Sequence, residues 1–172
     1  MSSDRYAIED LDTTHHHIDL FYCGEPQLDN ILHHPVLLQG CGRTFVVVPH
    51  ANSPEILACF TLNPRPKEVF STEKYTYVQL NILAVDRRFQ KQGIGRWILA
   101  QLFQYMVHRA ETEKLDYLLV DPLNDEIREY YLALEIGFVQ LPWGELILLV
   151  ETMRQAVAAI NYNTSPWFES NE

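Results

Sequence analysis

Residues 85–96 read Val85-Asp86-Arg87-Arg88-Phe89-Gln90-Lys91-Gln92-Gly93-Ile94-Gly95-Arg96. The residues before this stretch, from Val78, predict a β-strand, and those after it predict a helix from Ile94 to Ala110, because apolar side chains recur there at helical spacing. The first N–H groups of a helix have no intrahelical partner, and the helix dipole places partial positive charge beside them. A strand, a glycine-bearing loop and a helix start therefore predict a site for a phosphate group.

Two glycines suit this loop, because glycine has no Cβ and lets the backbone turn tightly and approach an anion closely. Other phosphate loops fit the stretch less well. A Walker loop ends in Gly-Lys-Ser/Thr, whereas Gly95 is followed by Arg96 and Trp97. A dinucleotide fingerprint has a third glycine where this chain has Ile98.

The 172 residues, 47% of them hydrophobic, are enough for one domain with a single buried core. No apolar run reaches the ~20 residues of a membrane span, and the start lacks a signal-peptide core. Cys23, Cys41 and Cys59 have no metal-ligand spacing, so we expect reduced thiols in a cytoplasmic protein. The run from His15 to His17 has no carboxylate or thiol at regular spacing, so we expect a polar loop there and no metal.

Apolar and turn patterns predict the other elements. We expect a short helix at 27–34, strands at 43–48 and 56–62 that form a hairpin, a central strand at 75–85, a buried strand at 117–120, a helix at 124–134, strands at 138–141 and 145–151, and a tail after residue 159. The strand, helix and strand around the glycine loop predict a parallel crossover.

The pattern Gln90-x-x-Gly93-x-Gly95 matches the Gln/Arg-x-x-Gly-x-Gly/Ala signature of the GCN5-related N-acetyltransferases, the GNAT superfamily. The stretch from Leu83 to Gln90 and the order of elements also resemble this superfamily. The resemblance implies an α/β (α+β mixed sheet) fold, the GNAT acyl-CoA N-acyltransferase fold, with a central mixed β-sheet flanked by helices. It implies one domain at residues 1–160 and a tail at 161–172 that is disordered or packs on a partner. Aromatic residues in the tail suggest a homodimer contact, although an exposed tail fits equally.

The resemblance also implies acetyl-CoA as co-substrate. In the superfamily the pantetheine arm pairs with the central strand, and the backbone N–H groups of the loop and helix start hold the pyrophosphate. Gln90 or Lys91 would flank the pyrophosphate. The implied acetyl-CoA-binding residues are Leu83, Ala84, Val85, Gln90, Lys91, Gln92, Gly93, Ile94, Gly95, Arg96, Trp97 and Asn124.

A tyrosine in an Asn-x-x-Ala-x-x-Phe/Leu-Tyr pattern usually protonates the departing thiolate in this superfamily. Here Asn124 and Tyr131 have that spacing, so the resemblance implies Tyr131 as the catalytic acid. A phenol of pKa ~10 is not badly matched to a thiolate of pKa ~8.5. The family glycine follows its tyrosine by four positions, whereas Gly137 follows Tyr131 by six, so Tyr130 remains an alternative.

The general base is less defined. The central strand offers Gln79 and Asn81 but no carboxylate before Asp86. A water chain could take the proton, or the amine could already be neutral. Asp121 and Asp125 fit either a cleft or a solvated helix start. Phe21, His33 and His34 fit either an acceptor groove or a structural role.

We expect an acetyl-CoA-dependent N-acetyltransferase that moves the acetyl group to a primary amine by direct transfer in a ternary complex, without a metal. The net charge of −10 and pI near 5.1 disfavour broad attraction to nucleic acid and favour a small amine, an antibiotic or a protein amino terminus. The local basic cluster of Arg87, Arg88, Lys91 and Arg96 leaves nucleic acid open, although the CoA phosphates already account for this cluster.

One alternative follows from Phe21-x-Cys23-Gly24-x-x-x-Leu28-Asp29, which resembles the GNAT toxins. Those toxins pair with small DNA-binding antitoxins and acetylate the amino group of aminoacyl-tRNA, so tRNA and an antitoxin are partners only in this case. A non-catalytic acetyl-CoA-binding module is the other alternative.

Overall fold

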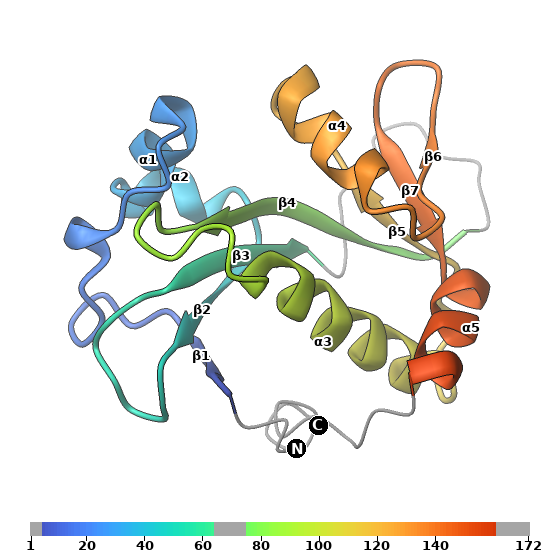
Figure 1. The fold of residues 1–172 in the computed structure, drawn as a ribbon, viewed down its shortest axis with the longest axis horizontal. Coiled ribbons are helices and arrows are strands. Elements are labelled where there is room, and N and C mark those ends of the chain that lie inside the picture. The colour runs from blue at the N-terminus through green and yellow to red at the C-terminus, as the bar shows by residue number, and fades with distance from the viewer. Residues whose placement is uncertain (1–4, 64–74, 161–172) are drawn as a thin grey trace. The chain divides into compact units, whose positions relative to one another are not determined.

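The computed structural model describes residues 5–63 and 75–160 (Figure 1). The elements run β1 Ala7–Asp10, the 3-10 helix η1 Ile18–Leu20, α1 Pro26–Leu32, α2 Pro35–Gln39, β2 Arg43–Val48, β3 Ala58–Asn63, β4 Tyr77–Val85, α3 Ile94–Arg109, β5 Tyr117–Val120, α4 Asp125–Ala133, β6 Val139–Gln140, β7 Leu146–Leu149 and α5 Val150–Ile160. The strands form one mixed sheet in the order β1-β2-β3-β4-β5-β7-β6. Strand β4 and the phosphate-loop helix α3 therefore form where the sequence predicts them.

The chain divides into two compact units. Of the described residues, the first unit holds 5–62 and 82–101, and the second holds Asn63, 75–81 and 102–160. Strand β4 and helix α3 each run from one unit into the other. The single domain at 1–160 stays a prediction, and the predicted tail at 161–172 lies outside the described residues.

The first unit is built on antiparallel pairing of β1, β2 and β3. The predicted hairpin of 43–48 with 56–62 is confirmed, and Phe45 lies opposite Phe60 with stacked rings 5.2 Å apart. Strand β1 was not predicted, because its four residues, Ala-Ile-Glu-Asp, are too short and polar for a clear pattern. It forms at the sheet edge through its pairing with β2.

The predicted helix at 27–34 is wrong in extent. The structure has α1 and a second short helix, α2, each with a proline in its first turn. His34, which precedes Pro35, is extended with φ −121° and ψ 96°, because the proline ring disfavours helical backbone in the residue before it. The chain therefore breaks at His34 and starts a new helix.

The second unit contains the predicted parallel pair, with Tyr77 opposite Tyr117 and Leu80 opposite Val120. Strand β7 pairs antiparallel with β5 and with the two-residue β6. The predicted strand at 145–151 is too long, because β7 ends opposite the first residue of β5 and has no ladder partner beyond it. The Val150 N–H donates to the Asp116 carbonyl at 2.9 Å and opens α5, a helix that was not predicted.

Within the described residues, no helix combines the length and apolar composition needed to cross a membrane.

Candidate active site

The loop between β4 and α3 has the backbone that the glycine pattern predicts. Lys91 and Gly93 have positive φ, at 63° and 84°, so the chain makes a left-handed turn just before the helix. A Cβ added to Gly93 would meet no atom within 4 Å, which leaves open space above this turn. Helix α3 begins at Ile94, as predicted, and Gly95 is buried beneath the turn.

The first amides of α3 point to an anion site. The N–H groups of Ile94, Gly95 and Arg96 donate to no acceptor in the part of the chain that the structure describes. The Trp97 N–H donates to the Gly93 carbonyl at 3.0 Å, so this amide completes the first helical turn. The backbone N–H groups available to an anion therefore end at Arg96. Trp97 can contact an anion only through its side chain, and the Trp97 ring lies edge-on to Tyr6 with the ring centres 5.2 Å apart.

Asp86 is the buried charge at the start of this loop, with 1% of its surface exposed. Burial acts to raise its pKa, but hydrogen bonds from the Arg88 side chain and backbone and from the Tyr22 backbone outweigh burial and lower the pKa. The carboxylate is therefore ionised and paired with Arg88. Of the basic cluster after β4, Arg87, Lys91 and Arg96 remain exposed and outside this ion pair.

Strand β4 alternates regularly between fully buried and partly exposed residues. Gln79, Asn81, Leu83 and Val85 share the partly exposed face, and Ala84 is buried on the other. The residues expected beside the pantetheine arm thus stand on both faces of the strand end. The face that carries Leu83 and Val85 carries amides and no carboxylate.

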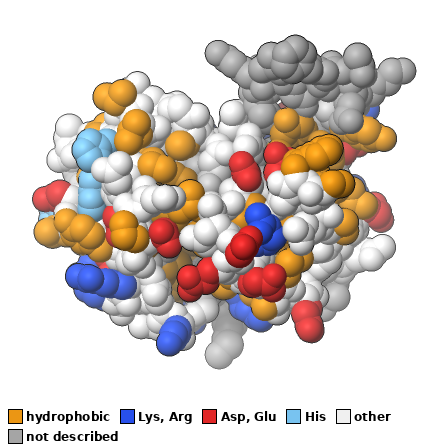
Figure 2. Space-filling view, turned by 90° about the horizontal axis from the view of Figure 1, so that it is seen from above, with side chains coloured by type: hydrophobic (Ala, Val, Ile, Leu, Met, Phe, Trp, Pro, Cys, Tyr) orange, Lys and Arg blue, Asp and Glu red, His pale blue; other side chains and the backbone are white. Residues whose placement is uncertain are grey.

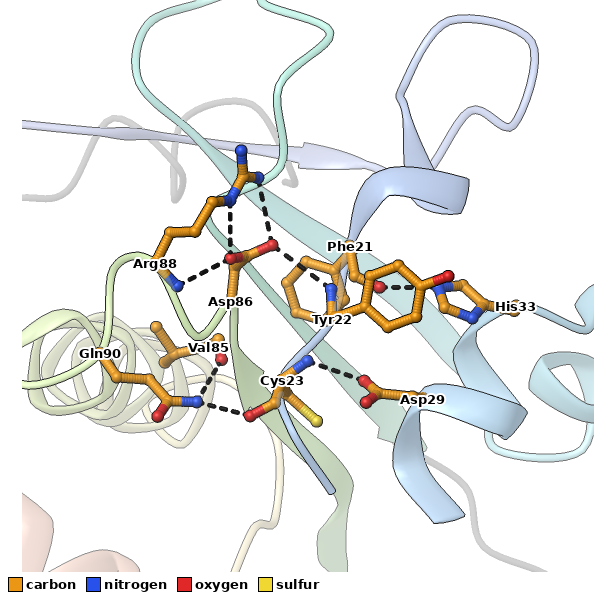
Figure 3. Close-up of polar contacts among 9 residues, drawn as sticks. All are labelled: Phe21, Tyr22, Cys23, Asp29, His33, Val85, Asp86, Arg88 and Gln90. Atoms are coloured by element: carbon orange, nitrogen blue, oxygen red, sulfur yellow. Dashed lines mark hydrogen bonds and ion pairs between the residues drawn. The ribbon is translucent and has the colours of Figure 1, made fainter. Parts of the chain in front are cut away.

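Gln90 makes a contact that sequence reasoning did not foresee. Its amide nitrogen donates to two carbonyls, those of Cys23 at 2.7 Å and Val85 at 2.9 Å (Figure 3). The residue was expected to flank the pyrophosphate. In the structure its amide nitrogen joins the end of β4 to the segment Phe21–Gly24, which follows η1.

Several contacts hold that segment in place (Figure 3). The Tyr22 N–H donates to Asp86 at 3.3 Å, and the Arg87 N–H donates to the Tyr22 carbonyl at 2.9 Å. From α1, Asp29 accepts the N–H groups of Cys23 and Gly24 at 2.7 and 3.2 Å. The sequence motif that contains Cys23, Gly24 and Asp29 therefore indicated the contact of Asp29 with this segment, but it did not indicate the contact of Asp86 with Tyr22.

The three residues considered for an acceptor groove differ in environment. Phe21 is 1% exposed, so its ring belongs to the core, which is the structural role of the two that the sequence left open. The His33 ring nitrogen lies 2.6 Å from the Phe21 carbonyl oxygen, and its ring lies edge-on to Tyr22 at 4.6 Å. His34 is exposed and contacts the Asn30 carbonyl. Tyr22, 44% exposed, is the aromatic side chain that this segment presents to solvent.

Figure 2 shows hydrophobic side chains exposed together with histidine on the side of the molecule that carries α1 and α2. The large apolar residues exposed in this region are Leu20, Tyr22, Val36 and Leu37. The Arg87 guanidinium carbon lies 5.8 Å from the centre of the Tyr22 ring. Aromatic and basic side chains therefore adjoin at the phosphate-loop edge of this region.

In the second unit, Tyr131 lies near the C-terminal end of α4 and is 3% exposed. Its ring contacts Tyr130 and Phe138 edge-on, each at 5.4 Å. Burial, followed by the proximity of Tyr130, raises the pKa of Tyr131, so its phenol is protonated at neutral pH. Tyr130 is 43% exposed.

The ends of helix α4 explain the role of Asn124 and the long spacing from Tyr131 to Gly137. The Asn124 side chain caps the helix by accepting the Ile127 N–H at 2.9 Å. The helix ends at Ala133, and the extra residues follow it, with positive φ at Glu135 and Gly137. The insertion therefore leaves Tyr131 within the helix.

The thiols are poor nucleophiles. Burial raises the pKa of Cys23 to about 12 and that of Cys59 to about 12. Burial also raises the pKa of Cys41. Because a thiolate is the reactive form of cysteine, these residues are unsuited to carrying an acyl group at neutral pH.

Comparison with known proteins adds to these observations. A family model described as the acetyltransferase (GNAT) family matches residues 8–138. The tRNA-acetylating toxin of Mycobacterium tuberculosis (strain ATCC 25618 / H37Rv) is 28% identical over 156 residues, which cover 80% of this chain and 88% of the toxin.

Two solved structures of the toxin AtaT have the same fold. A Tyr-to-Phe variant bound to the C-terminus of the antitoxin AtaR and acetyl-CoA has a TM-score of 0.75 at 22% identity, covering 92% of this chain and 100% of that chain. AtaT complexed with acetyl-methionyl-tRNAfMet has a TM-score of 0.71 at 21% identity, covering 88% of this chain and 98% of that chain. At these identities the likeness concerns the fold, and it confirms the predicted mixed-sheet architecture.

Proposed function

Because the chain belongs to the acetyltransferase (GNAT) family, we propose that it transfers the acetyl group of acetyl-CoA to the amino group of an aminoacyl-tRNA. The observation that carries this proposal is the similarity to the tRNA-acetylating toxin, which extends over 80% of the chain. The solved complex of AtaT with an acetylated aminoacyl-tRNA agrees with it. The sequence alone favoured a small amine because of the net charge, and these comparisons support the alternative.

Features of the first unit fit acetyl-CoA. The amides of Ile94, Gly95 and Arg96, with no acceptor among the described residues, are donors suited to a pyrophosphate. The open space at Gly93 lets the phosphates approach the backbone. We assign the pantetheine arm to Leu83, Ala84 and Val85, and the flanking positions to Lys91 and Gln92. The AtaT structure with acetyl-CoA supports acetyl-CoA as the ligand, and the residue assignment rests on the strand, loop and helix of this chain.

The thioester supplies an activated acetyl group, and the amine of the acceptor attacks its carbonyl carbon. The raised pKa values of the cysteines argue against an acetyl-cysteine intermediate, which agrees with direct transfer. The α-amine of an aminoacyl ester has a low pKa, so it needs little help from a base. This agrees with a strand β4 that carries Gln79 and Asn81 but no carboxylate.

We assign the proton for the departing thiolate to the Tyr131 phenol, because it has the family spacing from Asn124 and is protonated at neutral pH. Burial raises its pKa, which makes it a weaker acid than an exposed phenol. Tyr130 remains the alternative donor. Asn124 contributes by capping the start of α4, the helix that carries Tyr131.

Net charge is the main argument against tRNA, and the charge near the phosphate loop weakens that argument. Residues 86–96 carry four basic side chains and one acidic side chain, although the chain as a whole has a charge of −10. Electrostatic attraction to RNA depends on the local surface within about 10 Å at ordinary salt. If these four basic side chains make the main contacts to tRNA phosphates, the affinity for tRNA should fall only modestly as the salt concentration rises.

The direct test is acetylation of a panel of aminoacyl-tRNAs with labelled acetyl-CoA, followed by mass spectrometry of the released aminoacyl-adenosine. Uncharged tRNA, free amino acids and peptides are the controls. We expect label on the amino group of charged tRNA and a much lower rate on free amines. Equal kcat/KM for free amines would contradict the tRNA proposal. Binding of acetyl-CoA without turnover on any acceptor would instead support a non-catalytic module.

The cellular counterpart is growth arrest. Expression of the chain in bacteria should stop growth, and Tyr131→Phe should relieve the arrest at equal protein level. By analogy with AtaT, we propose that an antitoxin partner neutralises the protein. Continued growth of cells with active, soluble wild-type protein would contradict a toxin role without affecting the proposed chemistry.

A further inference from the structure

The segment Phe21–Gly24 is fixed by hydrogen bonds along its backbone, although it lies between η1 and α1 and belongs to neither. Both backbone polar groups of Phe21, Tyr22 and Cys23 are bonded, as is the N–H of Gly24. Irregular segments usually leave such groups to water, so a segment bonded in this way has one defined path.

The bonds come from two directions. On one side, Asp29 of α1 accepts the N–H groups of Cys23 and Gly24. On the same side, His33, which directly follows the last residue of α1, contacts the carbonyl of Phe21. On the other side, the loop after β4 supplies Asp86, the Arg87 N–H and Gln90. Figure 3 shows the segment between these two groups of residues.

Cys23 is the residue at which the two sides meet. Its N–H donates to Asp29 at 2.7 Å, and its carbonyl accepts from Gln90 at 2.7 Å. The same Gln90 nitrogen also contacts the Val85 carbonyl, where the strand ends and the phosphate loop begins. A shift of the phosphate loop therefore moves Gln90, and Gln90 acts directly on the Cys23 carbonyl.

We propose that Gln90 and Asp29 are positioning residues that link the phosphate loop to the Phe21–Gly24 segment, so that occupation of the loop by CoA further restrains the bonded segment for the acceptor. This inference rests on the proposed acetyl-CoA site, but not on the identity of the acceptor. Tyr22 is the exposed side chain that the linked segment presents. The coupling makes acceptor positioning depend on a bound donor, as transfer in a ternary complex requires.

The first experiment uses Gln90→Met, which keeps the size and neutral charge of the side chain but removes the donor. Gln27→Met is the matched control, because Gln27 is an exposed residue of α1. We expect acetyl-CoA affinity to change less than about threefold, while kcat/KM for the acceptor falls about 10- to 100-fold. A raised KM for acetyl-CoA with an unchanged acceptor KM would overturn the proposal and make Gln90 a direct donor ligand.

The second experiment is a double-mutant cycle with Asp29→Asn, for which Asp19→Asn is the control. Asp29 and Gln90 hold opposite sides of the same residue, so their effects on acceptor kcat/KM should be strongly non-additive. Independent structural damage would give additive losses. Thermal unfolding of each variant verifies that the protein is folded.

The third experiment needs no acceptor, so it separates this inference from the tRNA proposal. Hydrogen–deuterium exchange of the Tyr22, Cys23 and Gly24 amides is followed by mass spectrometry with and without CoA, and the amides of α5 are the internal reference. CoA should slow the exchange of these three amides in the wild type and should lose that effect in Gln90→Met. Equal protection in both proteins would mean simple occlusion by the ligand and would refute the coupling. Failure of CoA to bind the wild type would refute the acetyl-CoA site itself.

Discussion

The Arg88 guanidinium holds both oxygens of the Asp86 carboxylate, with Nε 2.9 Å from Oδ1 and Nη2 3.2 Å from Oδ2. The carboxylate is buried, whereas about half of the Arg88 side chain is exposed. The pair closes the turn after β4, because the Arg88 N–H also donates to Oδ1. Asp86 is thus a structural charge at the base of the phosphate loop.

This carboxylate should contribute to the acid sensitivity of the fold. Its pKa is lowered in the folded protein, so its stabilisation is present above its unfolded pKa of about 3.9 and is lost as the pH falls through the folded value. Asp86→Asn should lower stability by about 1–3 kcal/mol at neutral pH, and this difference should disappear at low pH. Urea unfolding across pH measures it.

A suitable control is Asp10→Asn, since the Arg43–Asp10 pair is more than half exposed on both sides. Exposed pairs contribute about 0–1 kcal/mol, so this control should change little. A pH-independent loss in Asp86→Asn would contradict the assignment of the charge as the stabilising feature.

Gly93→Ala tests the phosphate loop. The φ of 84° is unfavourable for alanine by about 1–2 kcal/mol, and the added methyl meets no neighbour, so the cost is in the backbone. We expect weaker acetyl-CoA binding by about tenfold, measured by calorimetry. Gly40→Ala is the control, because Gly40 has helical backbone with φ −74°. Unchanged affinity in Gly93→Ala would show that the loop does not hold the phosphates.

Tyr131→Phe tests the proton donor. The ring contacts with Tyr130 and Phe138 are kept, so the melting temperature should change little. We expect kcat to fall about 100-fold or more, since general acid catalysis typically contributes at least that factor. Tyr130→Phe should remain active. The reverse outcome, with only Tyr130→Phe inactive, would transfer the role to Tyr130.

Thr61→Val tests a hydrogen bond in the sheet. The fully buried Thr61 hydroxyl accepts the Ile82 N–H at 3.0 Å, and valine would leave that N–H without its acceptor. We expect a loss of about 1–3 kcal/mol in chemical unfolding. Thr44→Val, opposite Thr61 in the register and partly exposed, should cost less than about 0.5 kcal/mol. Equal losses would indicate that side-chain shape, rather than the hydrogen bond, matters.

Gln104→Met should stabilise the protein. Gln104 is 6% exposed, and neither of its side-chain amide atoms has a hydrogen-bond partner among the described residues. Removing an unsatisfied buried amide should raise the free energy of unfolding by about 1–2 kcal/mol. A lower melting temperature would indicate a bound water or a partner for the amide.

The elements around the phosphate loop could be predicted because their patterns are local. The helix start at Ile94 and the strand at Tyr117–Val120 follow from glycine chemistry and from a short apolar run. Strand β1 and helix α5 depend on pairing and packing with residues far away in sequence, so a single sequence gave little sign of them. Pro35 indicates the start of helix α2, but the helical spacing of the apolar residues before it hides the end of α1.

The candidate site divides in the same way. The glycine positions and the spacing from Asn124 to Tyr131 are visible in the sequence. In the structure Asn124 caps the start of α4 and Tyr131 lies within α4. The contacts of Gln90 were not visible, because Cys23 lies 67 residues away. Net charge favoured a small amine, whereas the similarity to a tRNA-acetylating toxin supports a charged tRNA. A total over the chain carries no information about where the basic residues lie.

The backbone bonds of Phe21–Gly24 also bear on how acceptor preference can change. Asp29, Asp86 and Gln90 bind main-chain atoms of this segment, and main-chain atoms are the same for every residue type. Replacement of the exposed Tyr22 side chain would therefore leave the path of the chain intact. Related enzymes could diverge in the substrates they accept by exchanging single side chains on a constant support, without changing the loop between β4 and α3.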